Sequence, residues 1–370
     1  MRHLARSAPW TTGSTTEGQP MAQHRTRRRI ALAAALSVIS LGIGLAPASA
    51  EPPTAPGVVQ PSVQAPDGSY IKKIDVKDAR NVRLHVHSAA MNTTVLVDVL
   101  RPSDVSEPKP SLYLFNGAGG GMDAASWRRN TDALEFLGTK DINVIQVLGG
   151  AWSFYTDWIN PDPVLGVNKW QTFTTEELPP LVDAALGTNG VNAIAALSMT
   201  GTSVLNYAIA KPGLFRSVAA YSGIAQVSDP VGQEMVKLTV ETWGGGDTRN
   251  MWGPADSPMW AANDPMVNAD KLRGTHLFFS TGNGVPGEFD QAGGKFRMES
   301  PAETPQTVAL GAIIEAGVNW SNHNMNDRLN QLGIPAKFVY RNTGTHSWGY
   351  WQDDLKSSWP VLAEGLFSAP

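Results

Sequence analysis

A short apolar stretch that runs directly into a serine, and then into a helical pattern, constrains this chain most. Residues 192–197 read Asn-Ala-Ile-Ala-Ala-Leu, Ser198 follows, and apolar residues then recur at helical spacing. A serine on a sharp strand-to-helix turn holds its hydroxyl clear of the sheet edge, as a nucleophile elbow does. The helix N-terminus behind it favours developing negative charge. Ala196 and Thr200 stand where the G-x-S-x-G pattern has glycines, so a capped helix after a buried strand is the alternative.

The composition allows a large α/β protein and excludes several kinds of site. The 370 residues are 42% hydrophobic and 17% charged, and they include no cysteine. Disulfides, thiolate zinc sites and a cysteine nucleophile are therefore excluded. Seven histidines are present, two of them within the first 50 residues, and the rest are scattered. We predict no metal site.

Residues 1–50 have the features of a signal peptide. A basic segment at 24–29 precedes an apolar run at 30–45, and Ala48-Ser49-Ala50 resembles a cleavage site. Met21 is an alternative start, and a retained membrane anchor is the alternative interpretation. The pattern does not separate Sec from twin-arginine export. We predict a secreted protein of the cell envelope, whose residues 51–370 carry a net charge near −9. This acidity argues against nucleic acid as a partner.

The remaining chain is predicted to be one catalytic domain, residues 68–370, after a proline-rich lead-in at 51–67. Alternating patterns at 70–76, 82–87 and 94–100 predict antiparallel edge strands. From residue 111 apolar strands alternate with helical patterns, at 112–115, 142–148, 192–197, 217–221, 276–280 and 336–340. This alternation predicts a mostly parallel sheet with helices on both faces. His85 and His87 share one strand face, either as a metal pair or as ordinary surface histidines.

A glycine-rich loop follows the strand predicted at 112–115. Residues 116–121 read Asn-Gly-Ala-Gly-Gly-Gly, without the endings or spacing of nucleotide-binding loops. In the α/β-hydrolase fold an early loop of this kind supplies oxyanion-hole donors. We therefore interpret it as an oxyanion loop, with a merely flexible turn as the alternative.

A serine nucleophile needs a base, and in this fold the base follows it in the chain. Three histidines follow Ser198: His276, His323 and His346. His346 lies in a loop just after a predicted strand, where such sheets build their sites, and we choose it for that reason. Spacing alone does not select the acid, so five candidates stay open: Glu288, Asp290, Glu299, Glu303 and Glu315.

Several stretches resemble the antigen 85 family of secreted mycolyltransferases, in a longer form like that of corynebacteria. The most specific is Gly-Thr-His-Ser-Trp-Gly-Tyr-Trp at 344–351, and others are Leu-Ser-Met at 197–199, Leu-Phe-Arg-Ser-Val-Ala-Ala-Tyr-Ser-Gly at 214–223, Met-Trp-Gly-Pro at 251–254, Asn-Asp-Pro at 263–265 and Gly-Asn-Gly at 282–284.

The resemblance implies an α/β-hydrolase with no cofactor and a specific set of residues. Ser198 would be the nucleophile, His346 the base and Glu315 the acid. Ala118 and Met199 would donate oxyanion-hole N–H groups, while Asn116, Gly117 and Trp348 would contact substrate. Asn116 and Gly119 depart from the family's Asp-Gly-Leu-Arg loop, and Thr281 replaces its cysteine, so acceptor binding must differ.

The resemblance implies transfer of a mycoloyl group from trehalose monomycolate to trehalose monomycolate or arabinogalactan through an acyl-serine. Peripheral contact with envelope lipid is a further expectation. Aromatic residues at 152–158 would cover the site, and those at 348–351 would stack on sugar, unless they belong to the core. Two alternatives remain: a secreted carboxylesterase that hydrolyses lipid or sugar esters, and a catalytically silent wall-associated binding protein.

Overall fold

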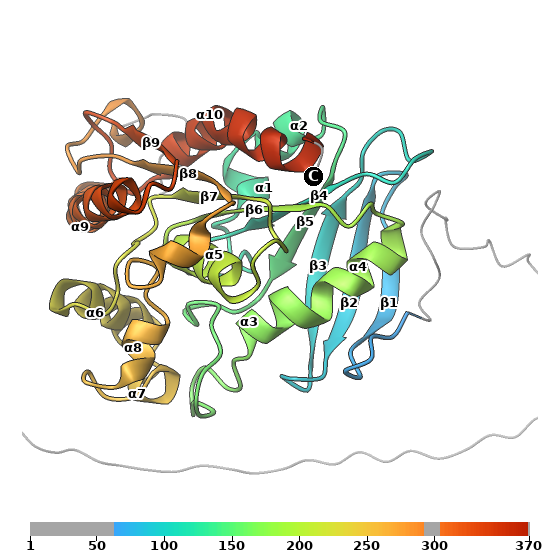
Figure 1. Cartoon of the computed structure of the whole chain (residues 1–370), viewed down its shortest axis with the longest axis horizontal. Helices are drawn as coiled ribbons and strands as arrows, with labels where there is room; N and C mark the ends of the chain where they lie inside the picture. Colours follow the sequence, from blue (N-terminus) through green and yellow to red (C-terminus); the bar gives the residue numbers. More distant parts are fainter. Residues whose placement is uncertain (1–62, 292–303, 369–370) are drawn as a thin grey trace, which may run out of the picture. The chain divides into compact units, whose positions relative to one another are not determined.

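A nine-stranded sheet runs through the part of the chain that the structure, a computed structural model, describes, residues 63–291 and 304–368 (Figure 1). Its order is β1-β2-β3-β5-β4-β6-β7-β8-β9. The strands are β1 (Tyr70–Val76), β2 (Asn81–Ser88), β3 (Thr93–Leu100), β4 (Ser111–Phe115), β5 (Asn143–Leu148), β6 (Asn192–Leu197), β7 (Ser217–Tyr221), β8 (His276–Thr281) and β9 (Lys337–Tyr340).

The sheet changes from antiparallel to parallel along its width. Strands β1, β2 and β3 pair antiparallel with one another, and β3 pairs antiparallel with β5. From β5 to β9 every pairing is parallel. The predicted antiparallel edge and parallel centre are both confirmed.

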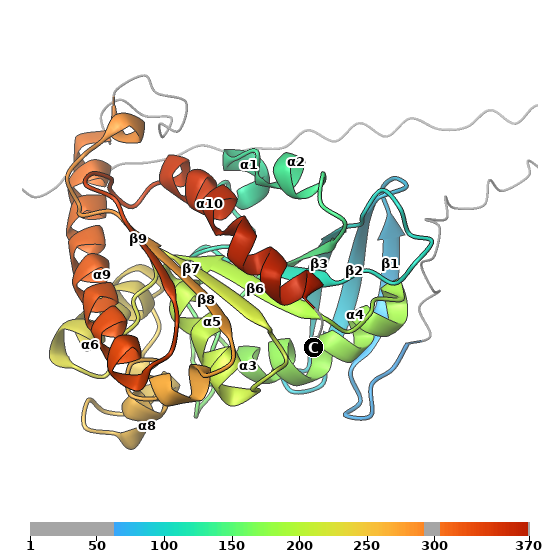
Figure 2. The same ribbon diagram turned by 45° about the horizontal axis from the view of Figure 1, so that its top comes forward.

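Helices cover both faces of the sheet, as predicted. Along β4, Tyr113 and Phe115 belong to one hydrophobic core, whereas Leu112 and Leu114 belong to the other. This alternation follows from the two-residue period of a strand, and both faces are apolar because both are covered. Figure 2 shows α10 on one face of the sheet and α4 and α5 on the opposite face.

The helical segments have the following bounds. The α-helices are α1 (Trp127–Asn130), α2 (Ala133–Leu137), α3 (Trp170–Thr172), α4 (Leu178–Leu186), α5 (Met199–Ala210), α6 (Pro230–Lys237), α7 (Thr248–Met251), α8 (Pro258–Ala262), α9 (Thr304–Leu332) and α10 (Trp348–Phe367). Two π-helical segments are η1 (Phe173–Glu177) and η2 (Leu238–Trp243), and two 3₁₀ turns are η3 (Ala269–Leu272) and η4 (Glu288–Asp290).

The parallel strands end at one edge of the sheet, and polar residues follow three of the four strands β6 to β9 there. Leu197 of β6 pairs with Tyr221 of β7, and Thr281 of β8 pairs with Tyr340 of β9. The next residue after each strand is Ser198, Ser222, Gly282 or Arg341. The topology therefore brings four neighbouring loops together at the carboxyl ends of the strands, where α/β sheets build sites.

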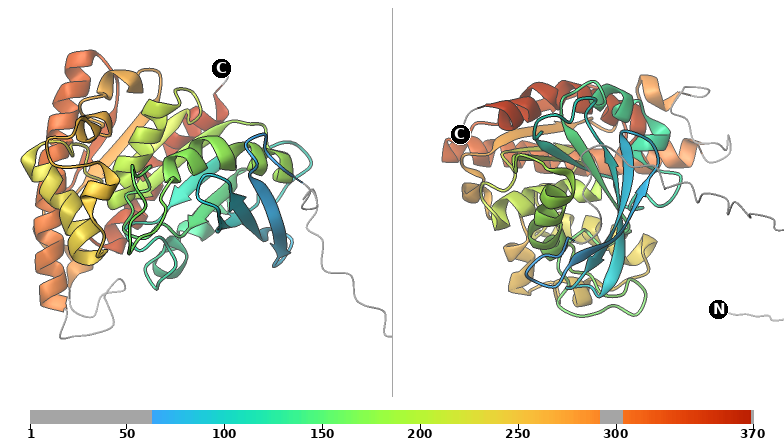
Figure 3. Two further views of the ribbon diagram at one scale, coloured as in Figure 1. Left: turned by 90° about the horizontal axis from the view of Figure 1, so that it is seen from below. Right: turned by 90° about the vertical axis from the view of Figure 1, so that its right-hand side faces the viewer.

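The long helix α9 lies at the β9 end of the sheet, far from the blue strands β1 and β2 (Figure 3). It carries Glu315. No helix in the described ranges is long and apolar enough to cross a membrane. The predicted signal peptide and residues 51–62 of the lead-in lie outside the described residues.

Candidate active site

Ser198 occupies a strained position between β6 and α5. Its backbone has φ 56° and ψ −133°, a region that residues other than glycine rarely adopt. Its N–H donates to the carbonyl of Tyr221 at 2.8 Å. A Cβ on Gly201 would lie 2.7 Å from Cα of Gly223, so α5 can approach the loop after β7 this closely only with glycine there. Strain of this kind is held by surrounding contacts and is typical of functional sites.

His346 connects Ser198 to Glu315 through its two ring nitrogens. The Ser198 hydroxyl lies 2.7 Å from Nε2, and Nδ1 lies 2.9 Å from Oε2 of Glu315. An ionised carboxylate can only accept, so we assign the ring proton to Nδ1, which leaves Nε2 to accept from the serine. Trp351 packs edge-on against the imidazole, with ring centroids 4.8 Å apart. This geometry suits a general base that takes the serine proton.

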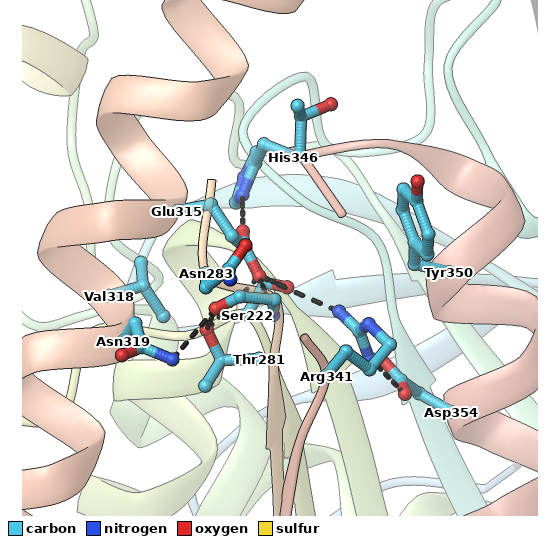
Figure 4. A network of polar contacts seen from close by, with 12 residues as sticks. Ser222, Thr281, Asn283, Glu315, Val318, Asn319, Arg341, His346, Tyr350 and Asp354 are labelled. Carbon is cyan, nitrogen blue, oxygen red and sulfur yellow. Dashed lines mark hydrogen bonds and ion pairs between the residues drawn. The ribbon is translucent and has the colours of Figure 1, made fainter. Parts of the chain in front are cut away.

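Glu315 is fully buried and hydrogen-bonded at both carboxylate oxygens (Figure 4). Its Oε1 accepts from the Ser222 hydroxyl at 2.7 Å, from the Gly282 N–H at 2.7 Å and from the Thr281 hydroxyl at 3.1 Å. Burial raises the pKa of this carboxyl, but the hydrogen bond and charge of His346, with the other donors, outweigh burial and lower it below 4.5. The group is therefore ionised at neutral pH.

The other candidate acids and bases that the structure describes serve other contacts or are exposed. Asp290 accepts from the Tyr350 hydroxyl at 2.7 Å and from the Thr345 hydroxyl, so it holds the loop that carries His346. Glu288 is exposed, and Glu299 and Glu303 lie outside the described residues. His276 lies 3.5 Å from Glu364, and His323 stacks on Tyr340.

The glycine-rich loop lies directly beside Ser198. A Cβ on Gly117 would lie 3.3 Å from Cβ of Ser198. The next residue, Ala118, lines the same cavity as Ser198 and accepts from the Trp152 N–H at 2.8 Å. Met199 is the first residue of α5, where N–H groups have no carbonyl partner within the helix. Both predicted donor residues therefore border the serine.

Asn116 supports the structure around the glycine-rich loop and is not part of the cavity lining. Its side chain is buried and its Oδ1 accepts from the N–H of Trp127 at 2.9 Å, which fixes the start of α1. Its carbonyl accepts from the hydroxyl of Thr200 at 2.6 Å. It does not line the cavity beside Ser198, so its predicted contact with substrate gains no support.

A cavity of about 290 Å³ opens at Ser198 and is lined mainly by apolar and aromatic side chains. Met235 of α6, Leu238 of η2, and Ile314 and Val318 of α9 belong to this apolar lining. Asp123, which lies against Gly119 of the glycine-rich loop, is among the polar lining groups. The cavity can therefore accept an elongated apolar group and offers Asp123 to a polar one.

Asp123 occupies space that a side chain at position 119 would need. A Cβ on Gly119 would lie 2.2 Å from its Oδ2. The Asp123 Oδ1 accepts from the N–H of Ala125 at 2.9 Å, which orients the carboxylate. It is the one carboxylate among the described residues that line the cavity.

The aromatic residues divide between the cavity and the core. Trp152, Phe154, Trp348 and Trp351 line the cavity, whereas Tyr155 and Trp158 are buried in the core, 0% and 1% exposed. Tyr350 is also buried and bonded to Asp290. The four aromatic residues that line the cavity can therefore cover the site or stack on a substrate, whereas Tyr155, Trp158 and Tyr350 cannot.

No cluster of potential metal ligands occurs within residues 63–291 and 304–368. His85 lies 2.7 Å from Oδ2 of Asp75 on the neighbouring strand, and His87 packs against Tyr70. The two histidines thus have ordinary strand partners.

Comparison with known proteins identifies the family to which the chain belongs. The Esterase family model matches residues 88–361. The chain is 33% identical over 294 residues to diacylglycerol acyltransferase/mycolyltransferase Ag85B of Mycobacterium leprae, covering 78% of this chain and 84% of the relative. It is also 34% identical over 268 residues to Ag85A of the same organism, covering 70% and 77%. The chain belongs to the antigen 85 family of mycolyltransferase-like esterases.

Solved structures place this antigen 85 family member in the α/β-hydrolase fold. MPT51 of Mycobacterium tuberculosis matches with a TM-score of 0.64 at 22% identity, over 78% of this chain and 100% of that one. The fluorophosphonate-binding serine hydrolase FphF of Staphylococcus aureus matches with a TM-score of 0.57 at 17% identity, over 76% and 97%. At such identities the likeness concerns the fold, and the predicted fold class is confirmed.

Sequence reasoning missed four residues that complete this antigen 85-like site: Asp123, Ser222, Thr281 as a donor, and Arg341. Ser222 and Arg341 directly follow β7 and β9, and polar residues right after buried strands are the signal that could have found them. Asp123 could not have been found this way, because its place depends on how the loop after β4 folds back over Gly119.

Proposed function

We propose that this antigen 85 family member is a secreted serine acyltransferase that moves mycoloyl groups from trehalose monomycolate to trehalose monomycolate or arabinogalactan. The observation that carries the proposal is the hydrogen-bonded series Ser198–His346–Glu315, whose serine and histidine line a largely apolar cavity. The relatives described as diacylglycerol acyltransferase/mycolyltransferases supply the reaction and substrate class.

The first half of the reaction forms an acyl-serine. His346 takes the Ser198 proton on Nε2 as the serine oxygen attacks the ester carbonyl. Backbone N–H groups of Ala118 and Met199 stabilise the resulting oxyanion, each by about 3 kcal/mol. The intermediate collapses, the C–O bond to the sugar breaks, and the imidazolium returns its proton to the leaving sugar oxygen.

The second half reverses these steps with a new alcohol. An acceptor hydroxyl gives its proton to His346 and attacks the acyl carbonyl, and Ser198 recovers its proton when it leaves. The reaction needs no cofactor, because the two proton transfers and the oxyanion donors are supplied by the chain.

The apolar lining of the cavity suits the acyl chain. Met235 and Leu238 line both this cavity and an adjoining surface groove with Pro230 and Val231. Val231 is 49% exposed, so the apolar lining continues outward from the serine. A long acyl chain could bury apolar area along this course, at roughly 0.8 kcal/mol per CH₂, and contact envelope lipid beyond it.

Two lining residues, Asp123 and Trp348, suit a sugar. We assign acceptor contacts to Asp123, whose carboxylate can accept from sugar hydroxyls, and to Trp348, which lines the same cavity. This arrangement takes the place of the aspartate and arginine that Asn116 and Gly119 replace. Gly117 contributes by lacking a side chain beside Ser198.

Hydrolysis of the acyl-serine by water is the alternative reaction, and membership of an esterase family supports testing for it. Trehalose monomycolate labelled in its acyl group separates the two reactions when incubated with the protein and free trehalose. We expect label in trehalose dimycolate, because transfer to free trehalose only regenerates labelled trehalose monomycolate. Label found only as free acid would make the protein a carboxylesterase. Absence of turnover, together with no fluorophosphonate labelling of Ser198, would make it a catalytically silent binding protein.

A further inference from the structure

An ion pair between a half-buried arginine and a buried aspartate lies next to the acid of the candidate triad. Arg341, the residue after β9, donates from Nη1 to Oδ1 of Asp354 on α10. Its Nη2 lies 3.6 Å from Oε1 of Glu315. The Arg341 side chain is 18% exposed, and those of Glu315 and Asp354 are 0% and 4% exposed. Figure 4 shows the guanidinium between the two carboxylates.

The contact between Arg341 and Glu315 is one of charge rather than hydrogen bonding. A separation of 3.6 Å is too long for a hydrogen bond, and Nη2 has no hydrogen-bond partner among the described residues. Oε1 of Glu315 already accepts from Ser222, Thr281 and Gly282. A cation this close in a buried site still lowers the energy of the ionised carboxylate considerably.

We infer that Arg341 is a positioning residue that keeps Glu315 ionised, and that Asp354 tempers its charge, so that the pair sets the pH at which the His346–Glu315 unit becomes a base. The inference rests on the proposed serine chemistry. The remaining observations are geometric: one half-buried cation lies between two buried carboxylates, and only Glu315 of the two contacts the histidine.

The charged and titratable groups around Glu315 come from the loop before α10, the end of β9 and α10. His346 faces it from the loop before α10, Arg341 from the end of β9, and Asp354 from α10. Ser222 and Thr281 present neutral hydroxyls. The Tyr350 ring lies 5.1 Å from the guanidinium carbon, and its hydroxyl is bound to Asp290. Arg341 is the one guanidinium or ammonium group in this set.

Removing each charge must shift the acidic limb of the pH profile, the fall in kcat/KM toward low pH, in a known direction. That limb reports proton binding by the His346–Glu315 unit as a whole. Without the Arg341 cation the unit holds its proton more tightly, so the limb moves to higher pH. Without the Asp354 anion the unit holds it less tightly, and the limb moves to lower pH. A pair that only supports folding would move the limb in neither case.

The experiment measures kcat/KM for hydrolysis of p-nitrophenyl butyrate against pH. We expect Arg341→Met to shift the midpoint of the acidic limb to higher pH, by about one pH unit. We expect Asp354→Asn to shift it to lower pH, by less. Arg341→Lys keeps the charge and should retain most of the wild-type profile. The double variant Arg341→Met/Asp354→Asn should lie between wild type and the single Arg341→Met variant, although it lacks the ion pair entirely.

A matched control separates this effect from loss of stability. Arg83 on β2 makes a two-point ion pair with the buried Asp98, at 2.6 and 2.8 Å, at the far end of the sheet. Arg83→Met should lower the melting temperature and leave the limb in place. Identical profiles for wild type, Arg341→Met and Asp354→Asn would overturn the inference. Failure of wild-type Ser198 to react with a fluorophosphonate would instead overturn the proposed function beneath it.

Discussion

Glu315 presents its Oε2 to Nδ1 of His346 at 2.9 Å, while its Oε1 accepts from three other donors. The division matters because a carboxylate fixed by several donors does not need to reorient during proton transfer. The carboxyl also stays ionised in a fully buried place, because the hydrogen bond and charge of His346, with the Ser222 and Gly282 donors, outweigh the effect of burial on its pKa.

Replacing the acid should therefore disable the base without moving it far. We expect Glu315→Gln to lower kcat by about 10³- to 10⁴-fold, because a neutral amide neither selects the productive tautomer nor stabilises the imidazolium. Steady-state hydrolysis of p-nitrophenyl butyrate measures this. Glu288→Gln changes an exposed glutamate nearby and should retain wild-type activity. Equal losses in both variants would show that Glu315 is not the acid.

Asp354 should give stability a distinctive pH dependence. Burial, with a contribution from Glu315 and against Arg341, raises the pKa of Asp354 from 3.8 to about 6. The folded protein then binds this proton more tightly than the unfolded chain, so its contribution to stability falls as pH rises through that window. Glu315, whose pKa is lowered, acts with the opposite sign: it stabilises above about 4.5 and loses this as pH falls through its folded pKa.

Comparing wild type with Asp354→Asn isolates the Asp354 contribution, because Glu315 is present in both. We expect the free energy of unfolding of wild type, relative to the variant, to decrease between about pH 4 and 6. Urea unfolding at several pH values measures it. A difference that stays constant, or increases, across this range would contradict the assignment.

A methyl group at Gly117 should damage the oxyanion site. A Cβ there would lie 2.6 Å from Cδ1 of Leu197 and 3.3 Å from Cβ of Ser198. We expect Gly117→Ala to lower kcat by about 10²-fold, because the loop that carries Ala118 must shift. Gly166→Ala is the control: its φ of 72° is strained for alanine but no atom lies within 4 Å. It should cost about 1 kcal/mol of stability and leave kcat unchanged.

Asp123 should affect the acceptor and spare the donor half of the reaction. We expect Asp123→Asn to raise the KM for trehalose about tenfold, the loss of one hydrogen bond to a charged group. The rate of acyl-enzyme formation with p-nitrophenyl butyrate should stay at the wild-type value. Asp141→Asn, an exposed carboxylate paired with Lys109, is the control. An equal change in the acylation rate would place Asp123 in the donor site instead.

The architecture could be predicted from the sequence because strands and helices here follow their local patterns. Buried parallel strands such as β6 and β7 read as short apolar runs, and the serine that ends β6 marks the turn into α5. His346 could be predicted for the same reason, because it lies in the loop just after β9.

The acid could not be predicted from the sequence pattern alone. Glu315 lies in the middle of the 29-residue helix α9, where a carboxylate normally faces water, and only the packing of α9 against the strand ends buries it. The roles of Arg341 and Asp354 depend on the same packing. Asn116 illustrates the converse: the loop position suggested a substrate contact, whereas the side chain is bonded to the backbone of Trp127.

The acyl-serine intermediate is tested most directly by the mass of the protein after brief incubation with trehalose monomycolate and acid quenching. We expect a mass increase equal to one mycoloyl group, located on the peptide that contains Ser198. This increase should be lost when trehalose is added before quenching and should be absent from Ser198→Ala. An acyl group on another residue, or normal acyl transfer by Ser198→Ala, would contradict this expectation.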